Sequence, residues 1–393
     1  MRAWASLRAL PRMVWLLGIV SLANDTASDM IYPLIPLYLT AVLMAGPRAL
    51  GLIEGVAEAA SSLLKLFAGI AADRTRSTRG WIIGGYAVSG LARPLIALAQ
   101  AWPGVLLCRL ADRAGKGLRS APRDALLSLS IQPHQRGLAF GVHRAMDNAG
   151  AVVGPLIAAA LLAAGLSLRS IFLWSVVPAI IVFLLTLYLK EPANDAPLTR
   201  TPMRWTLAGL PPTFRRYLVV LGLFTLGNSS NMFLLLRAES LGVTAEHIVL
   251  MWVLFSAVAM LLSAPLSALS DHFNRFHILG IGWGAYAAAY LFIGMLPNAS
   301  WTLWLAFAAY GVVTAALEGT EKALVADLVE GKRSGTAFGW YNLVAGIMLL
   351  PASLIFGWLW QTFSEQLAFG FGALCAAVAA VLLLMWVRPP SVA

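Results

Sequence analysis

Charged residues and cysteine are both scarce in this sequence of 393 residues. Only 12% of the residues are charged, whereas roughly 25% is usual in a soluble domain, and cysteine occurs twice. Cys108 and Cys375 both lie in apolar segments and give neither a disulfide framework nor a set of metal ligands. These shortages argue against a soluble domain, a disulfide-rich secreted fold and a cysteine-based metal centre.

Apolar residues are abundant where charged residues are scarce. They make up 60% of the chain, whereas about 45–50% is usual in soluble domains. In a soluble protein the net charge of +10 would point to nucleic acid as a partner. Here the basic residues gather in the loops between apolar stretches, so we expect a lipid bilayer and no nucleic acid as partner.

Twelve apolar stretches are long enough to cross a membrane, which takes about 20 residues. The first continues too far for a cleavable signal peptide and is expected to be a span. The sequence therefore predicts an all-α polytopic membrane protein with twelve transmembrane helices. The expected spans centre on residues 14–42, 50–72, 81–99, 104–128, 138–165, 171–189, 217–236, 248–270, 278–296, 301–324, 335–360 and 367–387.

The loops predict the orientation of the chain. An even number of spans puts both termini on one side, and the tails and loops of that side hold nearly all the basic loop residues. The other side has little more than Arg48 and Arg169. Because cytoplasmic loops carry an excess of Lys and Arg, both termini are expected in the cytoplasm of a bacterial-type inner (plasma) membrane.

The two halves of the chain resemble each other. RGLAFG (136–141) is echoed by SGTAFG (334–339), and APRDALL (121–127) by GTEKALV (319–325) at the same offset. Asp73 and Asp271 also match at this offset, and VSLAND resembles FTLGNS near the start of each half. This repeat predicts two pseudo-symmetric six-helix bundles, residues 1–190 and 217–393, joined by a cytoplasmic linker at 191–216.

Three motifs have the spacing of a known family. GIAADR, ending in Asp73 and Arg74, follows span two, and an intramembrane Arg109 followed by glycines lies in span four. Span five holds Gly141, Gly150 and Gly154-Pro155 in sequence. With the six-plus-six repeat, these motifs resemble the major facilitator superfamily, although Arg76, Asp112, Arg113, Ala158 and Ala159 depart from its usual residues.

The resemblance implies a fold and several roles. It implies transport by alternating access, with monomer as the expected state and no cofactor or metal. Asp73, Arg74 and Asp271 would belong to the cytoplasmic gate. Gly141, Gly150, Gly154 and Pro155 would form the antiporter motif, which is associated with proton-coupled exporters. A competing interpretation is that these are only small residues for helix packing.

Ionisable residues inside the expected spans are the candidate site. They are costly in lipid, so they usually face the bundle interior or a wet cavity. His143 and Asp147 are four residues apart and can interact, whereas Arg144 points elsewhere, with Asp112 or an acid of span one as candidate partner. A static salt-bridge network remains the alternative. The candidates for proton coupling are Asp25, Asp29, Glu54, Glu58, Asp112, His143 and Asp147.

The candidate substrate residues combine the basic stripe of span four with polar residues of both halves. Glu318 and Lys322 form an i,i+4 pair, which leaves Glu321 as the freer acid of span ten. We expect coupling in the first half, and shape with apolar contact in the second. The substrate candidates are Asn24, Arg109, Arg113, Lys116, Arg144, Asn228, Asn231, Glu318, Glu321, Tyr341 and Asn342.

The function that we favour is proton-coupled export of a small amphipathic anionic or zwitterionic compound, such as a drug, siderophore or metabolite. The excess of basic residues in the first half suggests such a substrate, although a lipophilic cation could use the acids. A proton-coupled importer is the alternative. A membrane enzyme with His143 and Asp147 as acid–base pair is a remote one, because the sequence has no nucleophile motif, phosphate loop or metal cluster.

Overall fold

The structure is a computed structural model that describes residues 10–75, 78–131, 136–190, 207, 209–298, 301–329 and 334–387, and its regular elements are all helices. The first six spans are α2 (Arg12–Ile31), α3 (Leu34–Leu37) and η1 (Tyr38–Val42); α4 (Pro47–Thr75); α5 (Thr78–Leu95) and η2 (Ile96–Leu98); α6 (Trp102–Leu129); α7 (Arg136–Ala163); and α8 (Leu168–Trp174) with α9 (Val176–Thr186).

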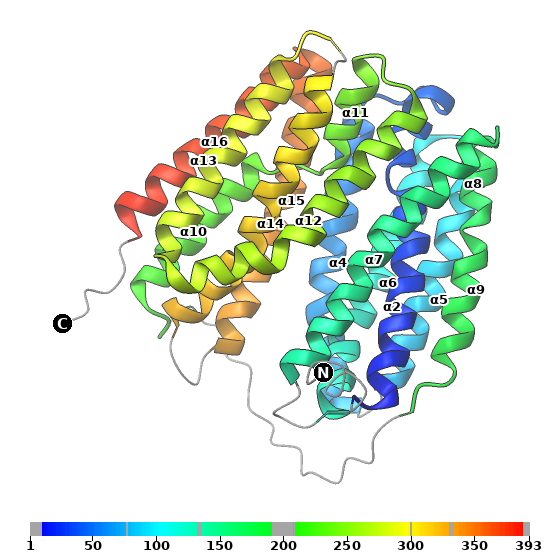
Figure 1. Ribbon diagram of the computed structural model, residues 1–393, viewed down its shortest axis with the longest axis horizontal. Helices are drawn as coiled ribbons and strands as arrows, with labels where there is room; N and C mark the ends of the chain where they lie inside the picture. Colours follow the sequence, from blue (N-terminus) through cyan, green and yellow to red (C-terminus); the bar gives the residue numbers. More distant parts are fainter. Residues whose placement is uncertain are drawn as a thin grey trace. The chain divides into compact units, whose positions relative to one another are not determined.

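The last six spans follow in the same way, as the colours of Figure 1 show. They are α10 (Pro212–Gly227) with α11 (Met232–Ser240), α12 (Ala245–His272), α13 (Arg275–Met295), α14 (Trp301–Leu328), α15 (Ser334–Thr362) and α16 (Glu365–Trp386). Each of the twelve expected spans thus coincides with a helix or with a helix interrupted once or twice. The predicted fold class is confirmed.

Nine helical stretches of the described chain are long and apolar enough to cross a membrane. The spans outside this set are the first, with α2, and those formed by α4 and α6. These three carry Asp25, Glu54 and Asp112 among their charged residues. Charge inside a span lowers its hydropathy, and each of these three spans carries candidate site residues.

Two of the interrupted spans are the first and the seventh. In the first span α2 ends at Ile31, and Pro33, which has no backbone N–H, precedes α3. In the seventh span α10 ends at Gly227 and α11 begins at Met232. Irregular backbone at membrane depth is tolerated only when protein buries it or a wet cavity adjoins it. The break between α10 and α11 therefore marks a candidate polar site.

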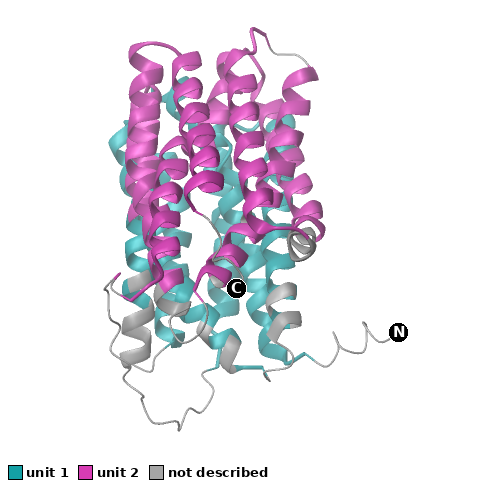
Figure 2. Ribbon diagram, turned by 90° about the vertical axis from the view of Figure 1, so that its left-hand side faces the viewer, with its two compact units in different colours: residues 1–43, 60–197 teal, residues 44–59, 198–393 magenta. Residues whose placement is uncertain are grey.

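The helices group into two compact units, which Figure 2 distinguishes by colour. Unit 1 comprises Met1–Leu43 and Ala60–Pro197, and unit 2 comprises Met44–Ala59 and Leu198–Ala393. The first part of α4 is therefore grouped with unit 2 and the remainder with unit 1. The predicted domain limits stay a prediction, and residues 191–206 of the predicted linker lie outside the described part of the chain.

Glycines set the closest helix contacts inside each unit. In unit 1 a Cβ atom on Gly115 of α6 would lie 2.5 Å from the carbonyl oxygen of Gly85 on α5. In unit 2 a Cβ atom on Gly227 of α10 would lie 2.5 Å from the carbonyl oxygen of Gly372 on α16. Real Cβ atoms do not approach this closely, so these helix pairs are in backbone contact.

Candidate functional site

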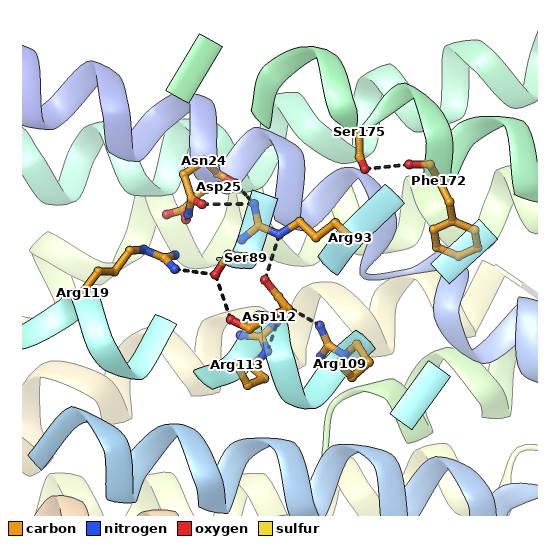
Figure 3. Close-up of polar contacts among 10 residues, drawn as sticks. All are labelled: Asn24, Asp25, Ser89, Arg93, Arg109, Asp112, Arg113, Arg119, Phe172 and Ser175. Atoms are coloured by element: carbon orange, nitrogen blue, oxygen red, sulfur yellow. Dashed lines mark hydrogen bonds and ion pairs between the residues drawn. The ribbon is translucent and has the colours of Figure 1, made fainter. Parts of the chain in front are cut away.

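A buried carboxylate on α6 lies close to three arginines in unit 1 (Figure 3). Asp112 lies 2.9 Å from Arg93 Nε, 3.2 Å from Arg109 Nη1 and 3.6 Å from Arg113 Nε. All four side chains are buried. The contact of Arg109 follows from the helical spacing of the sequence, because residues three positions apart share a helix face, whereas Arg113 is the next residue after Asp112.

Arg93 comes from α5 and was not among the residues that the sequence predicted. An arginine within an apolar span, just before Pro94, was the signal that could have found it. Arg93 Nη1 also donates to the side-chain oxygen of Asn24 at 3.0 Å and to its backbone oxygen at 3.2 Å. Asn24 in turn donates to Asp25 Oδ1 at 2.8 Å. Hydrogen bonds thus connect Asp112 of α6 with Asp25 of α2.

Arg119 extends this network along α6. Its Nη1 donates to the hydroxyl of Ser89 at 2.9 Å, and Ser89 donates to the backbone oxygen of Asp112 at 2.8 Å. The guanidinium also lies 4.5 Å from the centre of the Tyr86 ring, in a cation–π arrangement. Arg119 is buried, and electrostatic interactions join it to Asp25 and Asp112. Arg109, Arg113 and Arg119 of α6 are therefore buried inside unit 1.

Gly150 and Gly154 of the predicted antiporter motif pack on the backbone around the two acidic residues in α2. A Cβ atom on Gly150 would lie 2.6 Å from the carbonyl oxygen of Leu22 and 2.9 Å from Cβ of Asp25. A Cβ atom on Gly154 would lie 2.5 Å from the carbonyl oxygen of Thr26 and 3.1 Å from the carbonyl carbon of Asp29. The glycines of α7 and the carboxylates of α2 therefore belong to one contact.

His143 and Asp147 form the expected pair on α7. His143 Nδ1 lies 3.6 Å from Asp147 Oδ2, and the His143 side chain is 5% exposed. The remaining polar atoms, His143 Nε2 and Asp147 Oδ1, are buried and have no hydrogen-bond partner among the residues that the structure describes. Electrostatic interactions couple Asp147 to Asp25 and Arg123 to His143. The pair therefore adjoins the acidic residues of α2.

Several predicted residues of the first half lie apart from this network or at its edge. Glu54 is buried in the part of α4 grouped with unit 2, where Ser230 Oγ donates to it at 3.4 Å. Glu58 follows one turn later on the same helix. Lys116 and Arg144 are exposed, and Lys116 interacts electrostatically with Asp25 and Asp29.

Unit 2 places its polar residues among aromatic rings. Asn228 and Asn231, at the break between α10 and α11, accept hydrogen bonds from Tyr286 at 3.1 Å and from Tyr310 at 2.8 Å. Ser229 lies 3.3 Å from the hydroxyl of Tyr290. The rings of Tyr286 and Tyr290 are stacked with their centres 4.5 Å apart. Around these two asparagines, polarity thus comes from hydroxyl and amide groups.

Glu321 is the candidate acid of unit 2. Its Oε1 accepts a hydrogen bond from Trp283 Nε1 at 3.2 Å, and its Oε2 accepts one from the Tyr341 hydroxyl at 2.8 Å. The sequence predicted Glu321 and Tyr341 but not Trp283. Asn342, the next residue, is exposed and donates to the backbone oxygen of Phe338. The structure therefore brings Tyr341, and not Asn342, to the carboxylate.

Five predicted residues fall outside the side chains that the structure describes. They are the gate residues Asp73, Arg74 and Asp271, the first glycine of the antiporter motif, Gly141, and Glu318. The predicted pair of Glu318 with Lys322 stays a prediction for the same reason. Within the described part of the chain, no three His, Cys, Asp or Glu residues are arranged as a possible metal site.

Comparison with known proteins gives consistent matches over the whole chain. Residues 17–236 and 217–393 match the family model of the Major Facilitator Superfamily. An uncharacterized MFS-type transporter of Methanocaldococcus jannaschii is 33% identical over 387 residues, which cover 96% of this chain and 95% of that protein. The multidrug resistance protein MdtH of Photorhabdus laumondii is 25% identical over 341 residues, covering 84% of this chain and 82% of that protein.

Solved structures show the same fold. A variant of the nucleoside transporter NupG matches 95% of this chain and 99% of its own with a TM-score of 0.79. The sequence identity is 14%, so this likeness concerns the fold alone.

Proposed function

This chain belongs to the major facilitator superfamily and is a membrane transporter, not an enzyme, and we propose that it exports a small amphipathic compound in exchange for protons. The proposed substrate is anionic or zwitterionic. The proposed setting is the inner (plasma) membrane of a bacterial-type cell, with the transporter as a monomer and both termini in the cytoplasm.

One observation carries the proposal of proton-driven export. Gly150 and Gly154, which have the spacing of the antiporter motif, pack against the stretch of α2 that carries Asp25 and Asp29. A movement of α7 relative to α2 would change the surroundings of both carboxylates. A carboxylate that exchanges water for protein contacts, or gains and loses cationic neighbours, changes its affinity for protons. The contact is thus suited to load and release a proton during alternating access.

The charge balance of unit 1 supports an anionic group on the substrate. Arg93, Arg109 and Arg113 lie around the carboxylate of Asp112, and Arg119 lies in the same network. Buried charges need compensation, so a negative group from the substrate would be stabilised here. The name of the relative MdtH, a multidrug resistance protein, agrees with export of an organic compound.

Transport into everted membrane vesicles tests the direction and the coupling. Norfloxacin, a fluorescent zwitterion, would serve as the probe, and respiration would acidify the vesicle interior. We expect its uptake to require this chain and to stop when a protonophore collapses the gradient. Asp25→Asn should reduce driven uptake by about 5- to 150-fold, the range of a typical coupling between two sites.

Asp327→Asn is the matched control, because Asp327 is half exposed and pairs with Arg275 at the end of α14. It should leave uptake unchanged. Full driven uptake by Asp25→Asn would show that Asp25 is not the coupling residue. Gradient-driven uptake by right-side-out vesicles but not by everted ones would replace export with import.

A further inference from the structure

We propose that Glu321, Tyr341, Tyr217 and Trp283 of unit 2 form a binding site for a cationic group of the substrate, such as a protonated amine. The inference rests on the proposed function, since it concerns the compound to be transported. It narrows the proposed substrate class from anions or zwitterions to zwitterions, which carry a positive group.

The carboxylate of Glu321 is held in place but not neutralised by its hydrogen bonds. Trp283 of α13 and Tyr341 of α15 each bind one of its oxygen atoms, so three helices fix its position. Both donors are neutral. A carboxylate oxygen has two acceptor positions, so capacity for further donors remains on each oxygen. A protonated amine can supply such donors together with the opposite charge.

A neighbouring hydroxyl also lacks a partner. Tyr217 of α10 is fully buried, and its hydroxyl has no hydrogen-bond partner within the described structure. Electrostatic interactions connect this hydroxyl with both Glu321 and Tyr341. Leaving a buried hydroxyl without a partner costs roughly 1–3 kcal/mol. A ligand with polar hydrogens beside Glu321 would recover this free energy.

Aromatic rings adjoin the carboxylate. The ring of Trp283 is stacked on Phe224 with their centres 4.4 Å apart, and Phe224 contacts Tyr286 at 5.2 Å. Aromatic faces attract cations, by about 0.5–2 kcal/mol for each well-placed contact. A cation with an apolar or aromatic body therefore fits this part of unit 2 better than a small hydrated ion.

Glu321 is more exposed than its aromatic neighbours. Trp283, Tyr217 and Tyr341 are buried, whereas Glu321 retains part of its surface. A carboxylate at membrane depth is costly against lipid, so this surface is expected to face the bundle interior or a wet cavity. Lys322, the next residue, attracts Glu321 electrostatically, and its own side chain is exposed. It would compete with the ligand and should weaken binding.

Binding of two probes of the same shape and opposite charge tests the site. Tritiated tetraphenylphosphonium is a cation, tetraphenylborate is its anionic counterpart, and binding would be measured by equilibrium dialysis against the purified full-length protein in detergent. We expect Glu321→Gln to weaken phosphonium binding about tenfold or more, as the loss of roughly 1.4 kcal/mol requires. Borate binding should not weaken in this variant.

Further variants distinguish an effect of the charge on binding from a loss of the fold. Glu321→Asp keeps the charge and should retain most phosphonium binding, while Lys322→Gln should strengthen it. Asp327→Asn is the control and should change neither probe. Unchanged phosphonium affinity in Glu321→Gln, an equal loss for both probes, or no phosphonium binding by the parent protein would overturn the proposal. Phosphonium binding that depends on Glu321, without proton-driven uptake in vesicles, would support this site and overturn only the proposed export.

Discussion

The two units have different side chains at one corresponding contact between helices. In unit 1 the pair Asn24-Asp25 of α2 meets Arg93 of α5. In unit 2 the corresponding pair is Asn228-Ser229, at the end of α10, and Ser229 meets Tyr290 of α13. Arg93 and Tyr290 stand at the same place counted from the first residue of their helices.

Both sides of this contact therefore differ between the units: Asp25 corresponds to Ser229, and Arg93 corresponds to Tyr290. Where unit 1 has a guanidinium bonded to the amide of Asn24, which donates to the Asp25 carboxylate, unit 2 has two hydroxyl groups. The contact between the helices is retained in both, and only its charge differs. Unit 1 therefore has a titratable group at this place, whereas unit 2 keeps a neutral contact there and has its candidate acid elsewhere, at Glu321.

Removing Arg93 should have the largest effect, because it breaks the charged version of the contact. Arg93→Met would leave Asn24 and Asp112 without a principal partner in a buried site. Loss of one member of a buried ion pair costs about 3–5 kcal/mol. We expect the free energy of unfolding in detergent, measured by denaturant titration of tryptophan fluorescence, to fall by this amount.

Arg275→Met is the control for that variant. Arg275 pairs with Asp327, but both side chains are partly exposed, so the change should cost only about 0.2–1 kcal/mol. Equal losses of stability in Arg93→Met and Arg275→Met would show that burial does not distinguish the two ion pairs.

Enlarging Gly154 should have an intermediate effect. Gly154→Leu would insert a side chain where α7 touches the backbone of Thr26 and Met30. Overpacking of this kind costs typically 1–3 kcal/mol, and here it should also reduce proton-driven uptake of norfloxacin. Thermal melting and vesicle uptake would be measured on the same preparation.

Gly284→Leu in unit 2 provides the comparison. A Cβ atom at Gly284 would meet nothing within 4 Å, so this helix has room for a side chain. Stability and uptake should stay near those of the parent protein. If Gly154→Leu behaved in the same way, the contact of α7 with α2 would not matter for transport.

The smallest effect is expected from a change in the neutral contact of unit 2, between Ser229 and Tyr290. Tyr290→Phe removes a hydroxyl that lies near Ser229 and keeps the ring stacked on Tyr286. A neutral hydrogen bond contributes about 0.5–1.5 kcal/mol, so the unfolding free energy should fall by this amount at most. A loss as large as that of Arg93→Met would contradict the difference between the units.

The sequence predicted the helices better than their contacts. All twelve spans were found, because long apolar stretches are a direct property of the chain. The break between α10 and α11 was not foreseen, since residues 217–236 read as one apolar stretch. Membrane hydropathy measures composition over a window and does not register four residues of irregular backbone.

Pairings within the site were predictable only inside one helix. The contact of His143 with Asp147 follows from their spacing on α7, and the structure confirms it. The partners of Asp112 and Glu321 include Arg93 and Trp283, which lie on other helices. Helical periodicity gives the face of a residue but not the neighbouring helix that the face meets, so these pairs needed the structure.

The arginines around Asp112 have an electrical consequence. Three guanidinium groups lie around one carboxylate, so this part of unit 1 concentrates charged side chains inside the membrane. A conformational change that displaces these groups along the membrane normal moves charge through the transmembrane field. Carrying one elementary charge fully across 100 mV corresponds to about 2.3 kcal/mol. Membrane voltage, and not the pH difference alone, would then influence how often this transporter completes its cycle.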